Sequence, residues 1–69
     1  MTRPEAYSII DRLAARFPPG AWQLPAHELV QWLEGIADGK REGASRDERK
    51  DAKRVAKAVY KLEIQRYAF

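Results

Sequence analysis

The segment RDERKDAKRVAKAVYKLE (residues 46–63) decides the fold, because it carries the signals of a long helix and none that ends one. Ser45 precedes it and Glu48 follows three residues later, which is the spacing of a capping box at a helix N-terminus. Neither Pro nor Gly occurs from residue 46 to residue 69. The sequence therefore predicts a C-terminal helix of about 22 residues, about 33 Å long, that runs to Tyr67.

A first, shorter helix is expected near the start of the chain. Thr2 and Glu5 form another capping box, and apolar residues then recur at helical spacing as far as Phe17. The sequence FPPG (residues 17–20) ends this helix, because proline disfavours helical geometry in the residue before it.

The second short helix is expected to begin near Pro25, a residue that suits the first helical turn, and Gly39 is suited to the C-terminal cap. The polar link GKREGAS (residues 39–45) is long for the turn of a helix-turn-helix motif. The predicted fold is all-α. It is a single domain over residues 1–69, a helical hairpin or three-helix domain with two shorter helices and one long C-terminal helix.

The expected C-terminal helix has two contrasting faces. At about 100° per residue, one face carries a basic stripe, which consists of Lys50, Arg54, Lys57 and Lys61. The opposite face is apolar and widens toward the end of the helix, beyond the ~100° that packing against one neighbour needs. The last two turns are therefore expected to contact two neighbours, one of them a second copy of the chain. The predicted dimer residues are Val55, Val59, Leu62 and Ile64.

Size and composition narrow the classes of protein. A chain of 69 residues buries a small core, and the absence of cysteine excludes disulfides and thiolate metal sites. One histidine cannot build a zinc site unaided, so we expect a homodimer to supply the missing stability. The sequence contains neither a membrane-length apolar run nor a signal peptide, which predicts a cytoplasmic protein.

The positive charge is concentrated in the second half of the chain. Residues 1–39 carry three basic and five acidic groups, net −2, whereas residues 40–61 carry nine basic and four acidic groups, net +5. Such a segment indicates an anionic partner, either nucleic acid or an acidic protein surface. A solvated helix face without a partner is the alternative.

Enzyme chemistry is not indicated. The sequence has no Gly-rich phosphate loop and no nucleophile–base arrangement, and His27 and Glu28 point about 100° apart on a helix. We therefore predict a non-enzymatic protein with no catalytic residue, cofactor or metal.

Nucleic-acid binding and protein binding remain as two function classes. A basic stripe follows phosphates well, but the acids Asp47, Glu48 and Asp51 crowd the turns where a recognition helix presents its base-reading residues. Lysine also supplies point charge rather than bidentate base recognition. Aromatic residues favour protein binding, since they are common interface anchors, although Trp32 also suits the core. The predicted partner-binding residues are Trp22, Trp32, Tyr60, Tyr67 and Phe69, together with the basic stripe.

In length, composition and helical organisation the chain resembles the small accessory proteins of temperate bacteriophages, and more specifically the quorum-sensing anti-activators of phages that infect pseudomonads. The resemblance covers the whole chain and rests on no diagnostic motif. It implies a helical dimer that binds a LuxR-type transcription activator in the host cytoplasm, blocks its DNA binding, and also inhibits a pilus-assembly ATPase. The leading prediction is therefore a stoichiometric inhibitor of a host regulatory protein. The alternative is a small DNA-binding regulator that uses the basic stripe.

Overall fold

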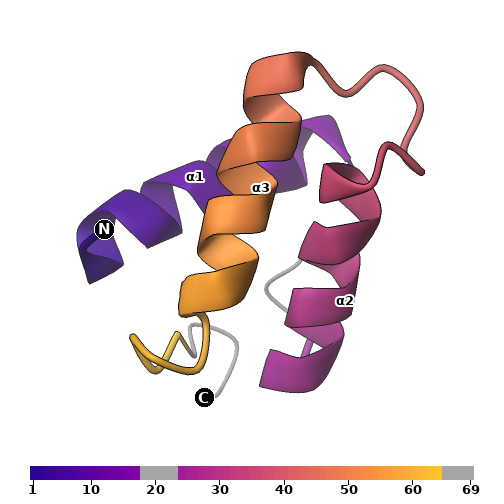
Figure 1. The fold of residues 1–69 in the computed structure, drawn as a ribbon. Helices are drawn as coiled ribbons and strands as arrows, with labels where there is room; N and C mark the ends of the chain where they lie inside the picture. Colours follow the sequence, from indigo (N-terminus) through magenta and orange to yellow (C-terminus); the bar gives the residue numbers. More distant parts are fainter. Residues whose placement is uncertain (18–23, 65–69) are drawn as a thin grey trace.

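The computed structural model describes residues 1–17 and 24–64, and these residues form three α-helices. They are α1 (Arg3–Arg16), α2 (Ala26–Ala37) and α3 (Arg46–Ala58). Over these ranges no residue is in a strand, so the predicted all-α class is confirmed (Figure 1).

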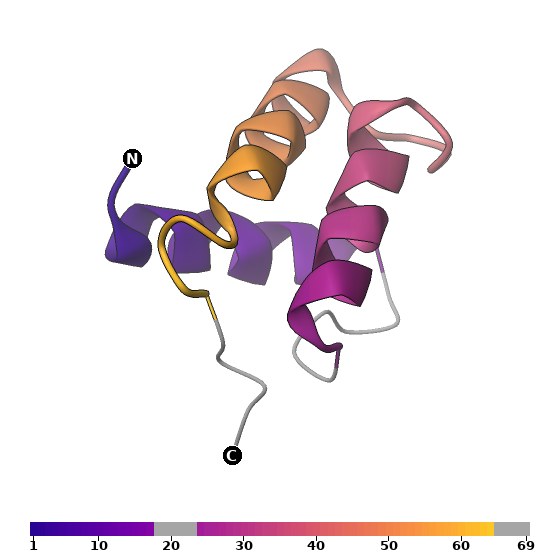
Figure 2. The ribbon, with the colours of Figure 1, turned by 60° about the horizontal axis from the view of Figure 1, so that its bottom comes forward.

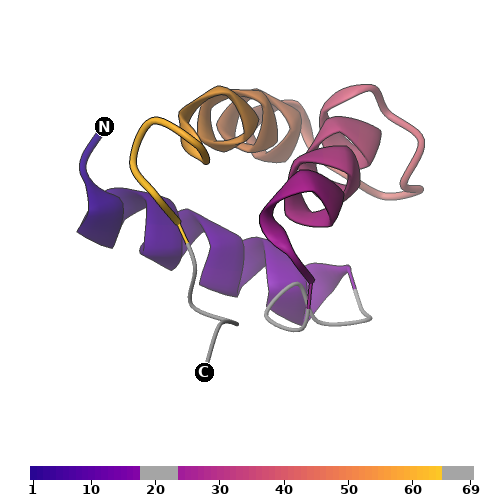
Figure 3. The same cartoon turned by 90° about the horizontal axis from the view of Figure 1, so that it is seen from below.

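The helices α2 and α3 lie side by side and run in opposite directions, joined by the loop at the top of Figure 1. Figures 2 and 3 show α1 crossing beneath this pair as a second layer. The helix α3 packs against both α2 and α1, whereas α1 and α2 contact each other far less. One face of α3 is consequently free of other helices.

The start of α1 follows the predicted capping box. The Thr2 hydroxyl accepts a hydrogen bond from the Glu5 backbone N–H at 3.3 Å, and the Glu5 carboxylate accepts one from the Thr2 backbone N–H at 3.1 Å. The Thr2 backbone N–H, followed by the Thr2 hydroxyl, which donates to the same carboxylate at 3.1 Å, holds the pKa of Glu5 below its ordinary value. The helix ends before Phe17, whose backbone N–H donates to the Leu13 carbonyl.

The end of α2 confirms the prediction that Gly39 belongs to its cap. Gly39 follows the C-cap residue Asp38 and has φ +79°, in the left-handed region that glycine adopts readily. The Lys40 N–H donates to the Gly35 carbonyl and the Gly39 N–H to the Ile36 carbonyl. This pair of bonds is the Schellman motif.

The helix α3 begins as predicted but is much shorter than predicted. The Ser45–Glu48 capping box is present, yet the helix is 13 residues long and ends at Ala58, so the prediction of one long C-terminal helix is wrong. One further turn follows, in which the Leu62 N–H donates to the Ala58 carbonyl at 2.8 Å.

Glu63 then reverses the chain. The Ile64 N–H donates to the Val59 carbonyl and the Glu63 N–H to the Tyr60 carbonyl, which is again the Schellman pattern. Here the left-handed position is occupied by Glu63, with φ +52°, instead of glycine. From α1, Arg3 supports the turn by donating to the Leu62 carbonyl at 2.6 Å and to the Glu63 carboxylate at 3.1 Å. The chain therefore folds back where the sequence pattern suggested a continuous helix.

All three helices and the final turn contribute to one apolar cluster. Its buried members are Ala6, Ile9, Ile10, Leu13, Phe17, Leu29, Trp32, Leu33, Ile36, Ala52, Val55, Val59 and Ile64. Every buried residue among those described is apolar or aromatic, so the charged groups lie outside this core.

Candidate anion-binding surface

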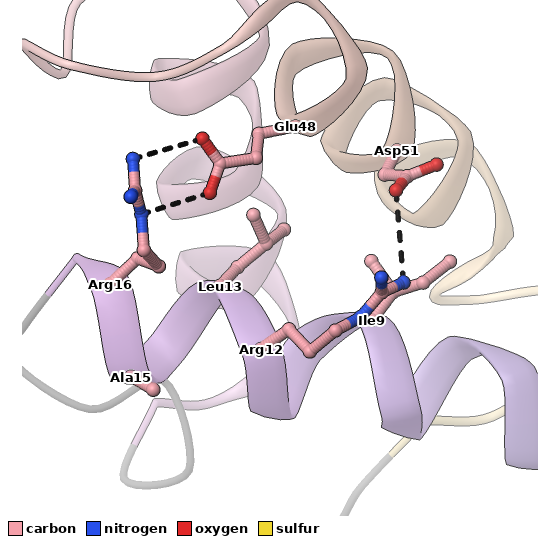
Figure 4. Close-up of a pocket in the computed structure, with 7 residues that line it drawn as sticks. All are labelled: Ile9, Arg12, Leu13, Ala15, Arg16, Glu48 and Asp51. Atoms are coloured by element: carbon pink, nitrogen blue, oxygen red, sulfur yellow. Dashed lines mark hydrogen bonds and ion pairs between the residues drawn. The ribbon is translucent and has the colours of Figure 1, made fainter.

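Two of the three acidic residues near the start of α3, Glu48 and Asp51, face α1. The Glu48 carboxylate pairs with the Arg16 guanidinium through two contacts of 3.0 and 3.1 Å, and Asp51 lies 3.8 Å from Arg12 (Figure 4). The Ser45 backbone N–H, followed by Arg16, holds the pKa of Glu48 below its ordinary value. These acids are therefore turned toward the arginines of α1.

The space between these two ion pairs is a cleft of about 370 Å³. Its lining residues are Ile9, Arg12, Leu13, Ala15, Arg16, Glu48 and Asp51 (Figure 4). All four charged side chains at the cleft pair with a group across it or beside it. The cleft therefore offers no uncompensated charge to a ligand.

The opposite flank of α3 and the turn after it carry five cations that we call the basic face: Lys50, Lys53, Arg54, Lys57 and Lys61. All five are exposed. Among the described residues, a shallow hollow of about 290 Å³ is lined by Lys50, Lys53, Arg54 and Lys57 alone. A neighbouring hollow of about 240 Å³ shares Arg54 and Lys57 and adds Lys61. The structure thus brings the predicted stripe together as one continuous surface.

The charges of the basic face are little compensated by the rest of the described chain. Arg54 forms an ion pair with Asp51 one turn earlier at 3.6 Å, so its charge is partly compensated. The four lysines make no ion pair with any residue in the ranges 1–17 and 24–64. The nearest acids on the α2 side are Glu34 and Asp38, which share a hollow of about 250 Å³ with Lys53 and Lys57. Most of this positive charge is therefore available to a partner.

Sequence reasoning left Lys53 out of the site. On the helical wheel Lys53 sits at the edge of the stripe, and only the hollow shows that it belongs to the same surface. The inward direction of Glu48 and Asp51 was also missed. The signal for it was present, because Arg12 and Arg16 are four residues apart and so share a face of α1.

The predicted aromatic anchors divide into three groups. Tyr60 is 63% exposed, directly after α3. Trp32 is buried in the core, so it is not a surface anchor, and its Nε1–H has no partner among the described residues. Trp22, Tyr67 and Phe69 lie outside the described residues.

The predicted dimer residues are placed mainly inside the single chain. Val55, Val59 and Ile64 are almost completely buried against α1 and α2, and Leu62 is half-buried. The prediction that these three side chains face a second copy is therefore wrong for this conformation. Val55 and Val59 lie on the side of α3 that packs against the other helices, and the turn at Glu63 folds Ile64 into the same core instead of extending the helix away from it.

Comparisons with known proteins identify no relative: no family model, curated protein or solved structure matches the chain. Within the described ranges, no three His, Cys, Asp or Glu side chains gather as a metal site would require. Over the same ranges, no helix has the length and apolar character needed to cross a membrane.

Proposed function

We propose that this protein is a small, non-catalytic nucleic-acid-binding protein that contacts the phosphate backbone through the basic face of α3. The observation that carries this proposal is the hollow that, within residues 1–17 and 24–64, is lined by Lys50, Lys53, Arg54 and Lys57 alone. Four cations around one hollow, without an acid among them, favour an anionic ligand because they repel one another until their charge is neutralised.

The dimensions of the basic face suit a phosphate backbone. From Lys50 to Lys61 the chain advances about 16 Å at 1.5 Å per residue. One strand of duplex DNA carries a phosphate about every 3.4 Å along its axis, so this length matches about five phosphates. Lysine is a compact, flexible point charge, which suits phosphates contacted without regard to base sequence. We therefore expect binding that is largely independent of sequence.

The acids at the start of α3 do not oppose this proposal as strongly as the sequence suggested. Glu48 is paired with Arg16 of α1. Asp51 lies 3.8 Å from Arg12 of α1 and 3.6 Å from Arg54. The charges of these two acids are therefore partly neutralised. Asp47 is exposed in the first turn of α3, so it is the acid that a phosphate approaching this end of the helix still meets.

The salt dependence of duplex binding tests the proposal. If each of the four lysines of the basic face neutralises one phosphate, log K should fall with log salt concentration at a slope of about −3.6. Lys57→Glu should weaken binding to duplexes of any sequence and reduce the slope by about 1. Lys40→Glu, the same charge change in the loop after α2, is the matched control and should change affinity much less. Equal effects of the two variants, or binding that is insensitive to salt, would refute the role of the basic face.

A second proposal, that the protein binds and blocks a host regulatory protein, is favoured by the exposed Tyr60 side chain beside the lysines. The partner surface would have to be acidic. The DNA-contacting surface of a LuxR-type activator must itself be positive to hold phosphates, so like charges disfavour docking there. An acidic surface elsewhere on the regulator is the better fit. A homodimer of the present chain, if it forms, would use surfaces other than the buried Val55, Val59 and Ile64.

One titration separates the two proposals. The protein is added to a purified LuxR-type activator bound to labelled operator DNA, and release of the operator is followed by anisotropy. If this protein releases the operator stoichiometrically but does not bind the operator itself, the result supports the proposal that it inhibits a regulatory protein. Release that parallels the protein's own affinity for the operator supports nucleic-acid binding.

A further inference from the structure

We propose that Tyr60 is a stacking platform for an unpaired base, which makes single-stranded nucleic acid the preferred ligand of the basic face. This inference rests on the proposed nucleic-acid function and names the class of nucleic acid. It is carried by the position of one exposed aromatic ring at the end of a row of cations.

Tyr60 is the most exposed large apolar or aromatic side chain in the described ranges. It is 63% exposed, compared with 39% for Met1, whereas Trp32 and Phe17 are both less than a tenth exposed. Burial of an aromatic side chain in a small core is strongly favourable. Tyr60 instead remains in solvent beside Lys57 and Lys61, its neighbours three residues before and one after.

The backbone around Tyr60 is fixed although its ring is free. The Tyr60 carbonyl accepts a hydrogen bond from the Glu63 N–H, and the Leu62 N–H continues the helical ladder to Ala58. Because this turn keeps helical bonding, Tyr60 remains close to the helical positions of Lys53 and Lys57, seven and three residues earlier. The Tyr60 backbone is thus held in place at one end of the basic face, and its ring is exposed there.

This combination of an aromatic ring and lysines distinguishes the classes of nucleic acid. A duplex offers phosphates to the lysines, but its bases are paired and stacked and have no free face for the Tyr60 ring. A single strand offers both its phosphates and the faces of its bases, and stacking tolerates any base because each has a π face. The strand would run along Lys50, Lys53 and Lys57 and place one base on Tyr60.

The test compares Tyr60→Ala, Tyr60→Phe and Lys57→Glu in the full chain. Binding to fluorescein-labelled oligo(dT), oligo(rU) and a mixed-sequence duplex is measured by anisotropy at fixed salt. Because one base stacked on an aromatic side chain contributes ~1–3 kcal/mol, Tyr60→Ala should weaken single-strand binding by about 5-fold or more. Tyr60→Phe should bind single strands like the unmodified protein, and duplex binding should be unaffected by either change. Lys57→Glu should weaken both ligands.

The other outcomes separate failure of this inference from failure of the proposed function. If Lys57→Glu weakens binding but Tyr60→Ala does not change single-strand affinity, the stacking role of Tyr60 is wrong. The proposal that the basic face binds nucleic acid is then still supported. An equal loss for single strands and duplex on Tyr60→Ala also overturns the single-strand preference. If no nucleic acid binds with the expected salt dependence, both proposals fail. Thermal unfolding followed by circular dichroism controls for misfolding of each variant.

Discussion

Arg16 of α1 and Glu48 of α3 form a two-point ion pair, with Nε 3.0 Å from Oε2 and Nη2 3.1 Å from Oε1. The same Glu48 carboxylate accepts the Ser45 backbone N–H at 2.8 Å, which closes the capping box of α3. Arg16 also donates to the Gly43 carbonyl at 2.9 Å. The Glu48 carboxylate therefore both caps the N-terminus of α3 and links this helix to the C-terminal end of α1.

The geometry of this pair predicts that Arg16→Ala destabilises the fold more than Arg12→Ala. Arg16 loses two charge-assisted contacts and the bond to Gly43, a cost of about 1 kcal/mol because the side chain is half exposed. Arg12 lies one turn earlier on the same helix, and its 3.8 Å contact with Asp51 is worth about 0–0.5 kcal/mol. Urea unfolding at pH 7 and low salt gives both values. Equal losses in the free energy of unfolding for the two variants would show that the two-point geometry of Arg16 is worth no more than an ordinary surface ion pair.

The lowered pKa of Glu48 predicts a pH dependence of stability. A carboxyl group whose pKa is lower in the folded than in the unfolded chain stabilises the fold above its ordinary pKa of 4.5. This contribution is lost as the pH falls through the folded value. Glu48→Gln keeps a side chain of the same shape without the charge, so it should be less stable than the unmodified protein at pH 7. The difference should disappear on acidification to a pH below the folded pKa, as followed by thermal unfolding. Glu42→Gln, in the loop before α3, is the control with the same chemical change. A Glu48→Gln deficit that persists at acidic pH would mean that charge is not its cause.

The helix starts could be predicted from the sequence because capping is local. Thr2–Glu5 and Ser45–Glu48 contain both partners of their capping boxes within four residues, and both form. The end of α2 was also predictable, since Gly39 supplies the left-handed residue that a Schellman turn needs.

The end of α3 could not be predicted in the same way. Its reversal places a non-glycine residue, Glu63, in the left-handed region, and its support comes from Arg3, 60 residues away in sequence. No local pattern contains that contact. The predicted helix therefore ran on, and Ile64 was assigned to a dimer instead of to the core.

For the candidate site, the sequence predicts the row of cations but not its surroundings. Helical spacing alone places Lys50, Arg54, Lys57 and Lys61 on one face, as the structure has them. The crossing of α1 under α3 determines which acids are neutralised, and this depends on tertiary packing. The exposure of Tyr60 likewise depends on tertiary packing.

The placement of Ile64 in the core predicts a large effect of Ile64→Ala. Removing a completely buried isoleucine side chain costs about 2–5 kcal/mol, whereas Leu62→Ala, at a half-buried neighbour, should cost less. Because the contacts are within one chain, the urea midpoint should not depend on protein concentration. Unfolding at two concentrations, tenfold apart or more, provides the measurement. The result that would contradict this placement is a urea midpoint that rises with protein concentration, and rises less for Ile64→Ala than for the unmodified protein. Ile64 would then belong to a dimer interface.

The backbone of Glu63 predicts that glycine is better than alanine at this position. Both Glu63→Gly and Glu63→Ala remove the ion pair with Arg3, so this loss cancels in the comparison. Alanine at φ +52° keeps a left-handed strain of about 1–2 kcal/mol, which glycine avoids at an entropic cost of about 0.5–1 kcal/mol in the unfolded chain. Glu63→Gly should therefore be more stable than Glu63→Ala in urea unfolding, by about 0.7 kcal/mol within a range of about 0–1.5 kcal/mol.

Gly39 provides the matched control for this comparison, because it occupies the same position in the Schellman turn of α2, with φ +79°. An added Cβ there would lie 3.6 Å from the Arg49 side chain, an ordinary contact, so Gly39→Ala tests backbone strain with little steric conflict. We expect Gly39→Ala to destabilise the protein by about the amount that separates the two Glu63 variants. If Glu63→Ala were as stable as Glu63→Gly while Gly39→Ala was destabilising, residue 63 would not be left-handed in solution. In that case the chain would not turn back at Glu63, and Ile64 would not be placed in the core by this turn.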